Sequence, residues 1–169
     1  MNPMRNIIIE KVTLNVGAGK DQQKLEKGVK LLKKITNIDP VKTITSKRIP
    51  SWGVRPGLPI GCKITLRKDK AAEVLKKLLE AKDNILTDSQ FGPSGNLSFG
   101  VHEYIDIPGI EYDPDIGIMG FEVCVTFERP GFRIKKRKNK KKKIKSNHMI
   151  SKEEVIETMK KRFNIKIGG

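Results

Sequence analysis

The stretch GAGK at residues 17–20, followed by Asp21, lies where a strand pattern gives way to a helix pattern. Backbone amides in such a turn, together with a helix N-terminus, can hold a phosphate. A Walker loop requires G-x-x-x-x-G-K-[ST], and here only its GK is present, with Asp21 in place of Ser or Thr. A tight turn is therefore the favoured interpretation. A phosphate contact to RNA stays open, whereas an ATPase is not expected.

The chain contains few residues that could carry out acid–base or thiol chemistry or bind a metal. His102 and His148 are the only histidines, and neither forms a triad or metal-ligand spacing with the acids at 106–115. Cys62 and Cys124 lie far apart, so we expect two small buried thiols in a reducing cytoplasm rather than a disulfide or zinc site. We predict no catalysis, no cofactor and no metal.

Positive charge is the strongest compositional signal. The chain of 169 residues carries 35 Lys and Arg against 19 Asp and Glu, for a net charge of +16. A polyanion is the expected partner, either nucleic acid or an acidic membrane surface. No apolar run approaches the roughly 20 residues that span a bilayer. The start, MNPMRNIIIEKV, is interrupted by Glu10 and does not resemble a secretory signal. We therefore favour nucleic acid and expect no membrane partner.

Ten of the cations, and no acid, lie in RIKKRKNKKKKIK at residues 133–145. Such a run is usually a solvated tail. The excess of cations is larger than solubility requires, so we favour contact of this segment with nucleic acid. We expect the segment to be disordered when free and ordered on binding. Phosphates carry no sequence information, so the specificity of this contact would be low. The candidate residues at its start are Arg133, Lys135, Lys136, Arg137 and Lys138.

The only tryptophan, Trp52, lies in RIPSWGVRPGLPIG at residues 48–61, between Arg48 and Arg55. The prolines of this segment exclude a long regular helix. Trp52 could fill a hydrophobic gap. Alternatively, a ring and guanidinium groups on a projecting loop can stack on bases or follow a sugar–phosphate backbone. Contact with RNA is the favoured alternative.

Periodicity predicts the elements that position these residues. Val12, Leu14 and Val16 alternate with polar residues, as in a half-buried strand. Strands are predicted at 11–16, 41–47, 60–67, 97–105 and 120–127. Helices are predicted after the caps Asp21 and Asp69 and after the capping box SKEE at 151–154. The polar segment 83–96 and the acidic segment 106–119 are left without an element.

These elements predict an α+β fold, with a mainly antiparallel sheet of about five strands and helices on one face. We expect a single RNA-binding domain at 1–132, a basic extension at 133–150, and a C-terminal helix at 151–169 on the same domain. The open sheet face should hold donors and cations and no acid, which suits a phosphate backbone. Its expected residues are Lys11, Thr13, Asn15, Lys63, Thr65 and Arg67.

Three segments together resemble the L-five family of large-subunit ribosomal proteins, in its archaeal and eukaryotic form. They are KVTLNVGAGK, TITSKRIPSWGVRPGLPIGCKITLR and NLSFGVHEYIDIPGIEYDPDIGIMGFEVCVTFERPGFRIKKRK. The resemblance extends from about residue 7 to 165, and RxGxPIGCKxTLR and GIEYDPDxGIxGF are its most specific parts. RPGFRIKKRK followed by ISKEE distinguishes this form from the bacterial one.

The resemblance implies binding to 5S ribosomal RNA, which the family helps anchor in the central protuberance of the large subunit. Together with the open face and the GAGK turn, the resemblance predicts a group of rRNA-binding residues. They are Lys11, Thr13, Asn15, Gly17, Gly19, Lys20, Thr45, Lys47, Lys63, Thr65 and Arg67. It also implies a loop that reaches the peptidyl-site tRNA, formed by Arg48, Ser51, Trp52, Gly53, Val54, Arg55, Pro56 and Gly57.

Further expected partners are large-subunit rRNA, a protein of the L-eighteen family and a bridge to the small subunit. The protein should then be a non-catalytic component of cytoplasmic ribosomes. The alternative is a general polyanion-binding or RNA-chaperone protein, in which the basic tail dominates and unrelated RNAs bind equally well.

Overall fold

The computed structural model describes residues 2–168, so residues 1 and 169 of the expected domain boundaries lie outside the described part. The strands are β1 (Ile8–Gly17), β2 (Val41–Ile44), β3 (Pro59–Leu66), β4 (Ile85–Thr87), β5 (Leu97–Val101), β6 (Phe121–Glu128) and β7 (Lys166–Gly168). The helices are α1 (Gln22–Thr36), α2 (Lys68–Glu80), α3 (Arg133–Lys136) and α4 (Lys152–Phe163).

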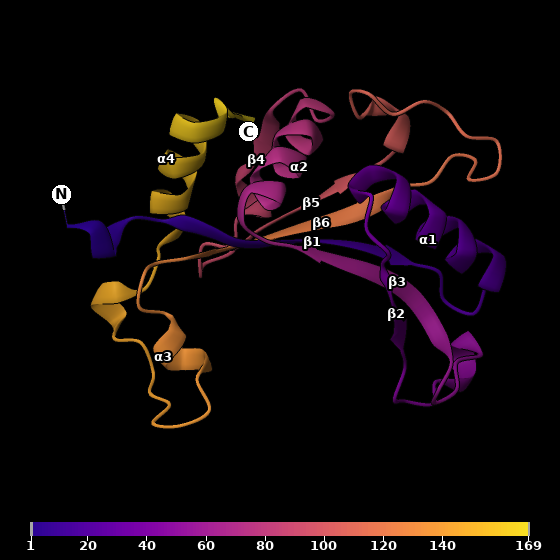
Figure 1. Cartoon of the computed structure of the whole chain (residues 1–169), viewed down its shortest axis with the longest axis horizontal. Coiled ribbons are helices and arrows are strands. Elements are labelled where there is room, and N and C mark those ends of the chain that lie inside the picture. The colour runs from indigo at the N-terminus through magenta and orange to yellow at the C-terminus, as the bar shows by residue number, and fades with distance from the viewer. Residues whose placement is uncertain (1, 169) are drawn as a thin grey trace.

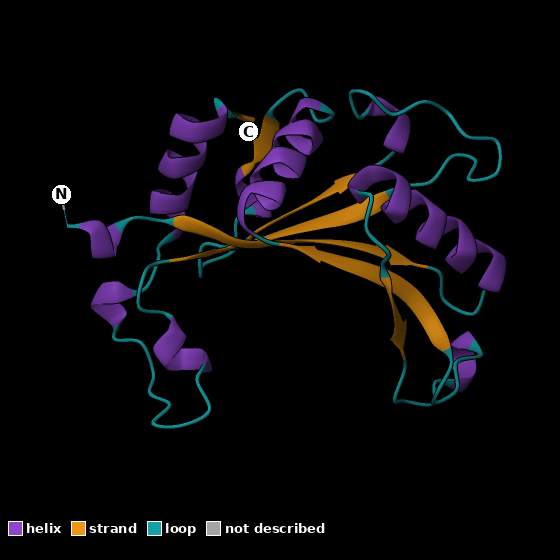
Figure 2. Ribbon diagram, in the orientation of Figure 1, coloured by secondary structure: helices purple, strands orange, loops and turns teal. Residues whose placement is uncertain are grey.

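The predicted five-stranded antiparallel sheet is confirmed, with the order β2-β3-β1-β6-β5. β1 is the central strand, and its residues Val12, Leu14 and Val16 are buried, as their alternation predicts. α1, α2 and α4 lie on one side of the sheet (Figure 1). The other side carries no helix of comparable length (Figure 2). The expected α+β architecture with one covered and one open face is therefore present.

Caps set the helix ends largely where the sequence predicts them. The Asp21 carboxylate accepts from the amides of Gln23 and Lys24 at the start of α1. α1 ends at Asn37, whose φ of 54° places it in the left-handed region. Ser151 and Glu154 form the predicted capping box of α4. The predicted cap at Asp69 is wrong, because α2 begins at Lys68 and Asp69 lies inside its first turn.

One hydrophobic core joins the sheet to all three long helices. Leu25, Leu75 and Met159 represent α1, α2 and α4 in this core, and each is at most 1% exposed. Arg129, which follows β6, is 4% exposed and donates to Glu154 of α4 at 2.6 Å. The C-terminal helix is thus tied to the sheet by packing and by one largely buried ion pair.

The structure corrects two predicted strand ends and adds two strands. The strand at 41–47 ends at Ile44, and the strand at 97–105 ends at Val101. The sequence pattern also does not predict β4 and β7, which pair in parallel as a separate two-stranded sheet. Each of these two strands has only three residues, too few for an alternating pattern to emerge.

Candidate nucleic-acid interface

The open face of the sheet brings the predicted rRNA-binding residues of β1 and β3 together. Asn15 lies opposite Lys63, and Thr13 lies opposite Thr65. Such directly opposed side chains on one face of an antiparallel pair have Cβ atoms roughly 4.5–5.5 Å apart. Amide, hydroxyl and ammonium donors are therefore adjacent at the centre of the sheet, and Lys63 and Thr65 are exposed.

The expectation that this face carries no acid is wrong. Glu122 of β6 lies opposite Asn15 and accepts from its side-chain amide at 3.4 Å. Glu10 and Glu128 lie on the same face, toward the start of β1. Glu122 and Glu128 reach the face through the pairing of β1 with β6, and Glu10 lies on β1 at the register shift between Ile9 and Lys11. The alternation of β1 and β3 alone could not reveal these three carboxylates.

A cluster of two acids and two cations closes this end of the face. Lys136 pairs with Glu10 and, at 2.8 Å, with Glu128, while Arg67 lies 3.4 Å from Glu10. Burial alone would raise the pKa of the Glu10 carboxyl. The hydrogen bond and charge of Lys136, together with Lys11 and Arg67, outweigh it and hold that pKa below its ordinary value. Arg67 and Lys136 therefore lie in an internal cluster, and are less free for phosphate than the sequence suggests.

The GAGK turn is confirmed as a tight turn. The amides of Ala18 and Gly19 both donate to the carbonyl of Ile60 at 2.9 Å, and Gly19 has a φ of 61°. Because these amides are already paired and Asp21 caps α1, the turn offers no amide cradle of the phosphate-binding kind. Gly17 and Lys20 are exposed, so they stay available for other contacts.

Residues 45–58 form a projection from the end of β2 and β3, hereafter the finger, at the lower right of Figure 1. At its base, Thr45 donates its amide to Leu58, and its hydroxyl caps the amide of Lys47. Near its tip, Ile49 and Val54 exchange backbone hydrogen bonds at 2.9 and 3.1 Å. Thr45 and Lys47 thus belong to this finger rather than to a strand.

Trp52 lies at the tip of the finger and is 69% exposed, so the alternative that it fills a hydrophobic gap is wrong. The turn there is closed by Gly53, whose φ of 66° favours glycine. Val54 is only 4% exposed, so its side chain is removed from the predicted contact surface. The other predicted loop residues, Arg48, Ser51, Gly53, Arg55, Pro56 and Gly57, are exposed.

The basic segment 133–145 begins with the short helix α3 and folds back toward the sheet through Lys136. It lies on the open side of the sheet, at the opposite end from the finger (Figure 1). Arg133, Lys135, Arg137 and Lys138 are exposed. Two basic projections therefore flank the open face.

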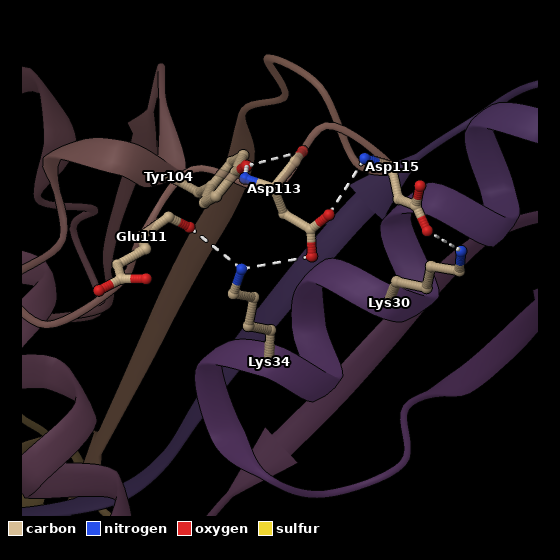
Figure 3. Close-up of polar contacts among 6 residues, drawn as sticks. All are labelled: Lys30, Lys34, Tyr104, Glu111, Asp113 and Asp115. Carbon is tan, nitrogen blue, oxygen red and sulfur yellow. Dashed lines mark hydrogen bonds and ion pairs between the residues drawn. The ribbon is translucent and has the colours of Figure 1, made fainter.

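A separate acidic segment, residues 107–119, is clasped onto α1 (Figure 3). Lys34 donates to the Glu111 carbonyl at 3.1 Å and pairs with Asp113 at 3.3 Å. The Asp113 amide donates to the Tyr104 hydroxyl at 2.8 Å. A hydrogen bond from the Asp115 amide, reinforced by Lys34, lowers the pKa of the Asp113 carboxyl. These acids therefore balance lysines of the same chain.

The remaining chemistry-bearing groups of residues 2–168 form no reactive site. Cys62 is buried, and burial raises the pKa of its thiol to about 11. Cys124 is exposed on the open face, which corrects its expected burial. Within the described range no three His, Cys, Asp or Glu residues converge as metal ligands, and no helix is long and apolar enough to cross a membrane.

Comparison with known proteins places this geometry in context. The family model described as "Ribosomal protein L5" matches residues 2–55, and the model for the C-terminus of the same ribosomal protein family matches residues 59–160. The large ribosomal subunit protein uL5 of Nanoarchaeum equitans is 48% identical over 167 residues, covering 98% of each chain. The uL5 protein of Sulfurisphaera tokodaii is 46% identical over 168 residues, covering 99% of this chain and 95% of its own.

Proposed function

The chain belongs to the ribosomal protein L5 family and is a non-enzymatic structural protein of the large ribosomal subunit, and from this premise we propose that it binds 5S rRNA and helps anchor it in the central protuberance. The observation that carries the proposal is the open sheet face, with Asn15 directly opposite Lys63 and Thr13 opposite Thr65. Donors held on paired strands have fixed spacing, so they can recognise the shape of a folded RNA as well as its charge.

The acids of this face support specific rather than purely electrostatic binding. Glu122 beside Asn15 repels phosphate, and it can accept from the amino group of a base. A surface selected for charge alone would not place a carboxylate in the same row as Lys63 and Asn15. We therefore assign 5S rRNA selectivity to the sheet face and a sequence-independent contribution to the basic segment.

The finger is proposed to contact the tRNA in the peptidyl site. Its support is the exposed ring of Trp52 on a hydrogen-bonded projection that also presents Arg48 and Arg55. Family membership further supports a neighbouring L-eighteen protein, contact with large-subunit rRNA and a bridge to the small subunit. We assign no residues of this chain to those three contacts.

A titration against 5S rRNA and a size-matched unrelated RNA, at several salt concentrations, tests the assignment. Replacing Asn15 and Lys63 by Ala should weaken 5S binding by roughly 100-fold or more, because hydrogen bonds to charged groups contribute about 1.5–3 kcal/mol each. Replacing Lys138 and Lys140 by Ala is the matched basic-segment control. This control should weaken the binding of both RNAs about equally and lower the salt dependence of binding.

Equal affinity of the wild-type protein for both RNAs at every salt concentration would instead favour the general polyanion-binding alternative. In that case the segment 133–145 carries the binding, and its removal should abolish it. The seven lysines of this segment other than Lys136 are exposed, which is the feature that keeps this alternative worth testing.

A further inference from the structure

The basic segment 133–145 and the end of the sheet enclose a groove of about 990 Å³, hereafter the tail groove. Its lysine wall is formed by Lys135, Lys141, Lys142 and Lys143. Apolar residues, among them Phe132, Ile144 and Met149, form its floor. The groove thus combines cations with an apolar surface, and it lies beyond the central row of donors assigned to 5S rRNA.

Both ends of the segment are anchored, so the groove has a defined shape. On the outgoing side, Lys136 is held by Glu10 and Glu128. On the returning side, the buried guanidinium of Arg129 donates to the Met149 carbonyl at 2.9 Å. Between them, the Lys142 amide donates to the Ile134 carbonyl at 3.3 Å. The segment is therefore a closed loop standing on the sheet, not a free tail.

The apolar floor is also fixed in place. The Phe132 ring packs edge-on against His148 at 5.7 Å between ring centroids, and the His148 ring is hydrogen-bonded to the Pro130 carbonyl at 2.9 Å. Met149 is 51% exposed, although its neighbour Ile150 is buried. An exposed apolar side chain in the floor of a lysine-walled groove calls for a ligand that has both an anionic and an apolar part.

The lysine wall is unneutralised. In the described chain, Lys136 is the only cation of the segment that takes part in an ion pair, and the ammonium groups of the wall take part in none. Their charge therefore remains available for an anionic ligand. Charge complementarity argues for a polyanion, and the floor selects among polyanions.

We propose that the tail groove binds an unpaired stretch of RNA, with phosphates on the lysine wall and a base against the apolar floor. A nucleotide supplies an anion and a flat apolar face within one residue, and single-stranded segments expose bases for such contacts. An RNA duplex presents its sugar–phosphate backbone outward and leaves the floor uncovered. An acidic peptide satisfies the lysines but offers no comparable apolar face. The inference rests on the proposed RNA-binding function, and adds a second RNA site to it.

Binding of three fluorescently labelled probes to the full-length protein tests this site. The probes are a short oligouridylate, an abasic oligomer with the same number of phosphates, and polyglutamate. The wild-type protein should prefer oligouridylate to the abasic oligomer by roughly tenfold, which matches the contribution of about 1–3 kcal/mol per stacked base. No preference between the two, or tighter binding of polyglutamate, would overturn the proposal.

Two variants locate the preference. Lys141→Ala/Lys142→Ala/Lys143→Ala should weaken oligouridylate binding roughly tenfold and lower its logarithmic salt slope by about two. The matched control is Lys70→Ala/Lys76→Ala/Lys77→Ala on the exposed side of α2, which removes the same charge far from the groove. Equal losses in both triple variants would mean that only net charge matters, and would overturn the site.

The floor variant Ile144→Ser/Met149→Ser keeps every charge and changes only half-buried or exposed positions. It should bind the abasic oligomer like the wild-type protein and lose the preference for bases. If the preference survives this change, the base lies elsewhere and the proposal fails.

Titration of the groove variants with 5S rRNA separates this failure from that of the proposed function. A retained 5S preference means that the sheet-face assignment stands whatever the groove does.

Discussion

At the scale of single residues, exposure separates contact residues from packing residues within one short motif. Trp52 and Val54 lie two positions apart, and their exposed fractions are 69% and 4%. The sequence predicts both as part of one loop surface, because the glycines and prolines around them carry no alternating pattern. The backbone pairing of Ile49 with Val54 is what turns the valine inward. Of these two residues, only Trp52 has the geometry of a side chain that meets another molecule.

Replacing Trp52 by Ala should change the free energy of unfolding by less than about 0.5 kcal/mol, because the ring buries little surface. Chemical footprinting of peptidyl-site tRNA on large subunits carrying the variant should show weaker protection than with the wild-type protein. Tyr112→Ala is the control, since this ring is 54% exposed but belongs to the clasped acidic segment. Unchanged protection in the Trp52 variant would remove the finger from the tRNA contact.

The carboxylates of the open face mark the limit of residue-level prediction. Lys11, Thr13 and Asn15 follow from the alternation of one strand, and Lys63 and Thr65 from that of another. β3 pairs with one edge of β1, and the strand that pairs with the other edge decides whether an acid lies beside these residues. That neighbour is β6, more than a hundred residues later, and its register sets Glu122 against Asn15. Register between distant strands is a tertiary property, so the sequence could predict the donors and not the acids.

At the scale of elements, long periodic segments with chemical caps were predictable, and short or aperiodic ones were not. α1 and α4 have a capping side chain at the start and an asparagine in the left-handed region at the end. β4 and β7 have three residues each and exist because they pair with one another across the chain. The acidic segment 107–119 likewise has no local signal for its position, since ion pairs and hydrogen bonds to α1 and Tyr104 hold it.

Because Lys34 makes two of these contacts, we expect its side chain to be essential for holding the acidic segment against α1. Replacing Lys34 by Ala removes the hydrogen bond to the Glu111 carbonyl and the partner of Asp113. Amide hydrogen exchange in residues 111–117 should then accelerate about fivefold, the effect expected from losing one such hydrogen bond. Lys33→Ala is the matched control, because Lys33 pairs only with the exposed Asp39 at the end of the same helix. Equal acceleration in both variants would show that helix α1, and not the clasp, controls this segment.

At the scale of the whole molecule, the basic segment 133–145 separates two parts of one core rather than ending a domain. Ile150, Val155, Met159 and Ile165 follow that segment, and all are buried with the residues of the sheet and of α2. We propose that residues up to 132 and the C-terminal helix fold as one unit, with the basic extension as an excursion between them. The covered side of the sheet is then completed by the end of the chain, while its open side is left for RNA.

Truncation after residue 132 tests this organisation. Fully burying one aliphatic side chain contributes about 1.5–3 kcal/mol, so losing those four removes about 6 kcal/mol or more. That is comparable to the whole stability of a small domain, about 5–15 kcal/mol. Truncation also removes Glu154, the ion-pair partner of Arg129. The shortened chain should therefore lose its cooperative urea unfolding transition and its near-ultraviolet circular dichroism signal.

The control for this truncation neutralises the excursion without shortening the chain, by replacing Lys138, Lys140 and Lys141 with Ser. These side chains are exposed and take part in no ion pair within the described residues, so the unfolding midpoint should stay near that of the wild-type protein while RNA affinity falls. Cooperative unfolding of the truncated chain at the wild-type midpoint would make the C-terminal helix an accessory of the RNA-binding domain. Loss of cooperativity in both variants would instead place the basic segment itself within the folding unit. The expected result separates the two roles that we propose for this region, namely stabilisation of the fold by α4 and RNA binding by the lysines between the anchors.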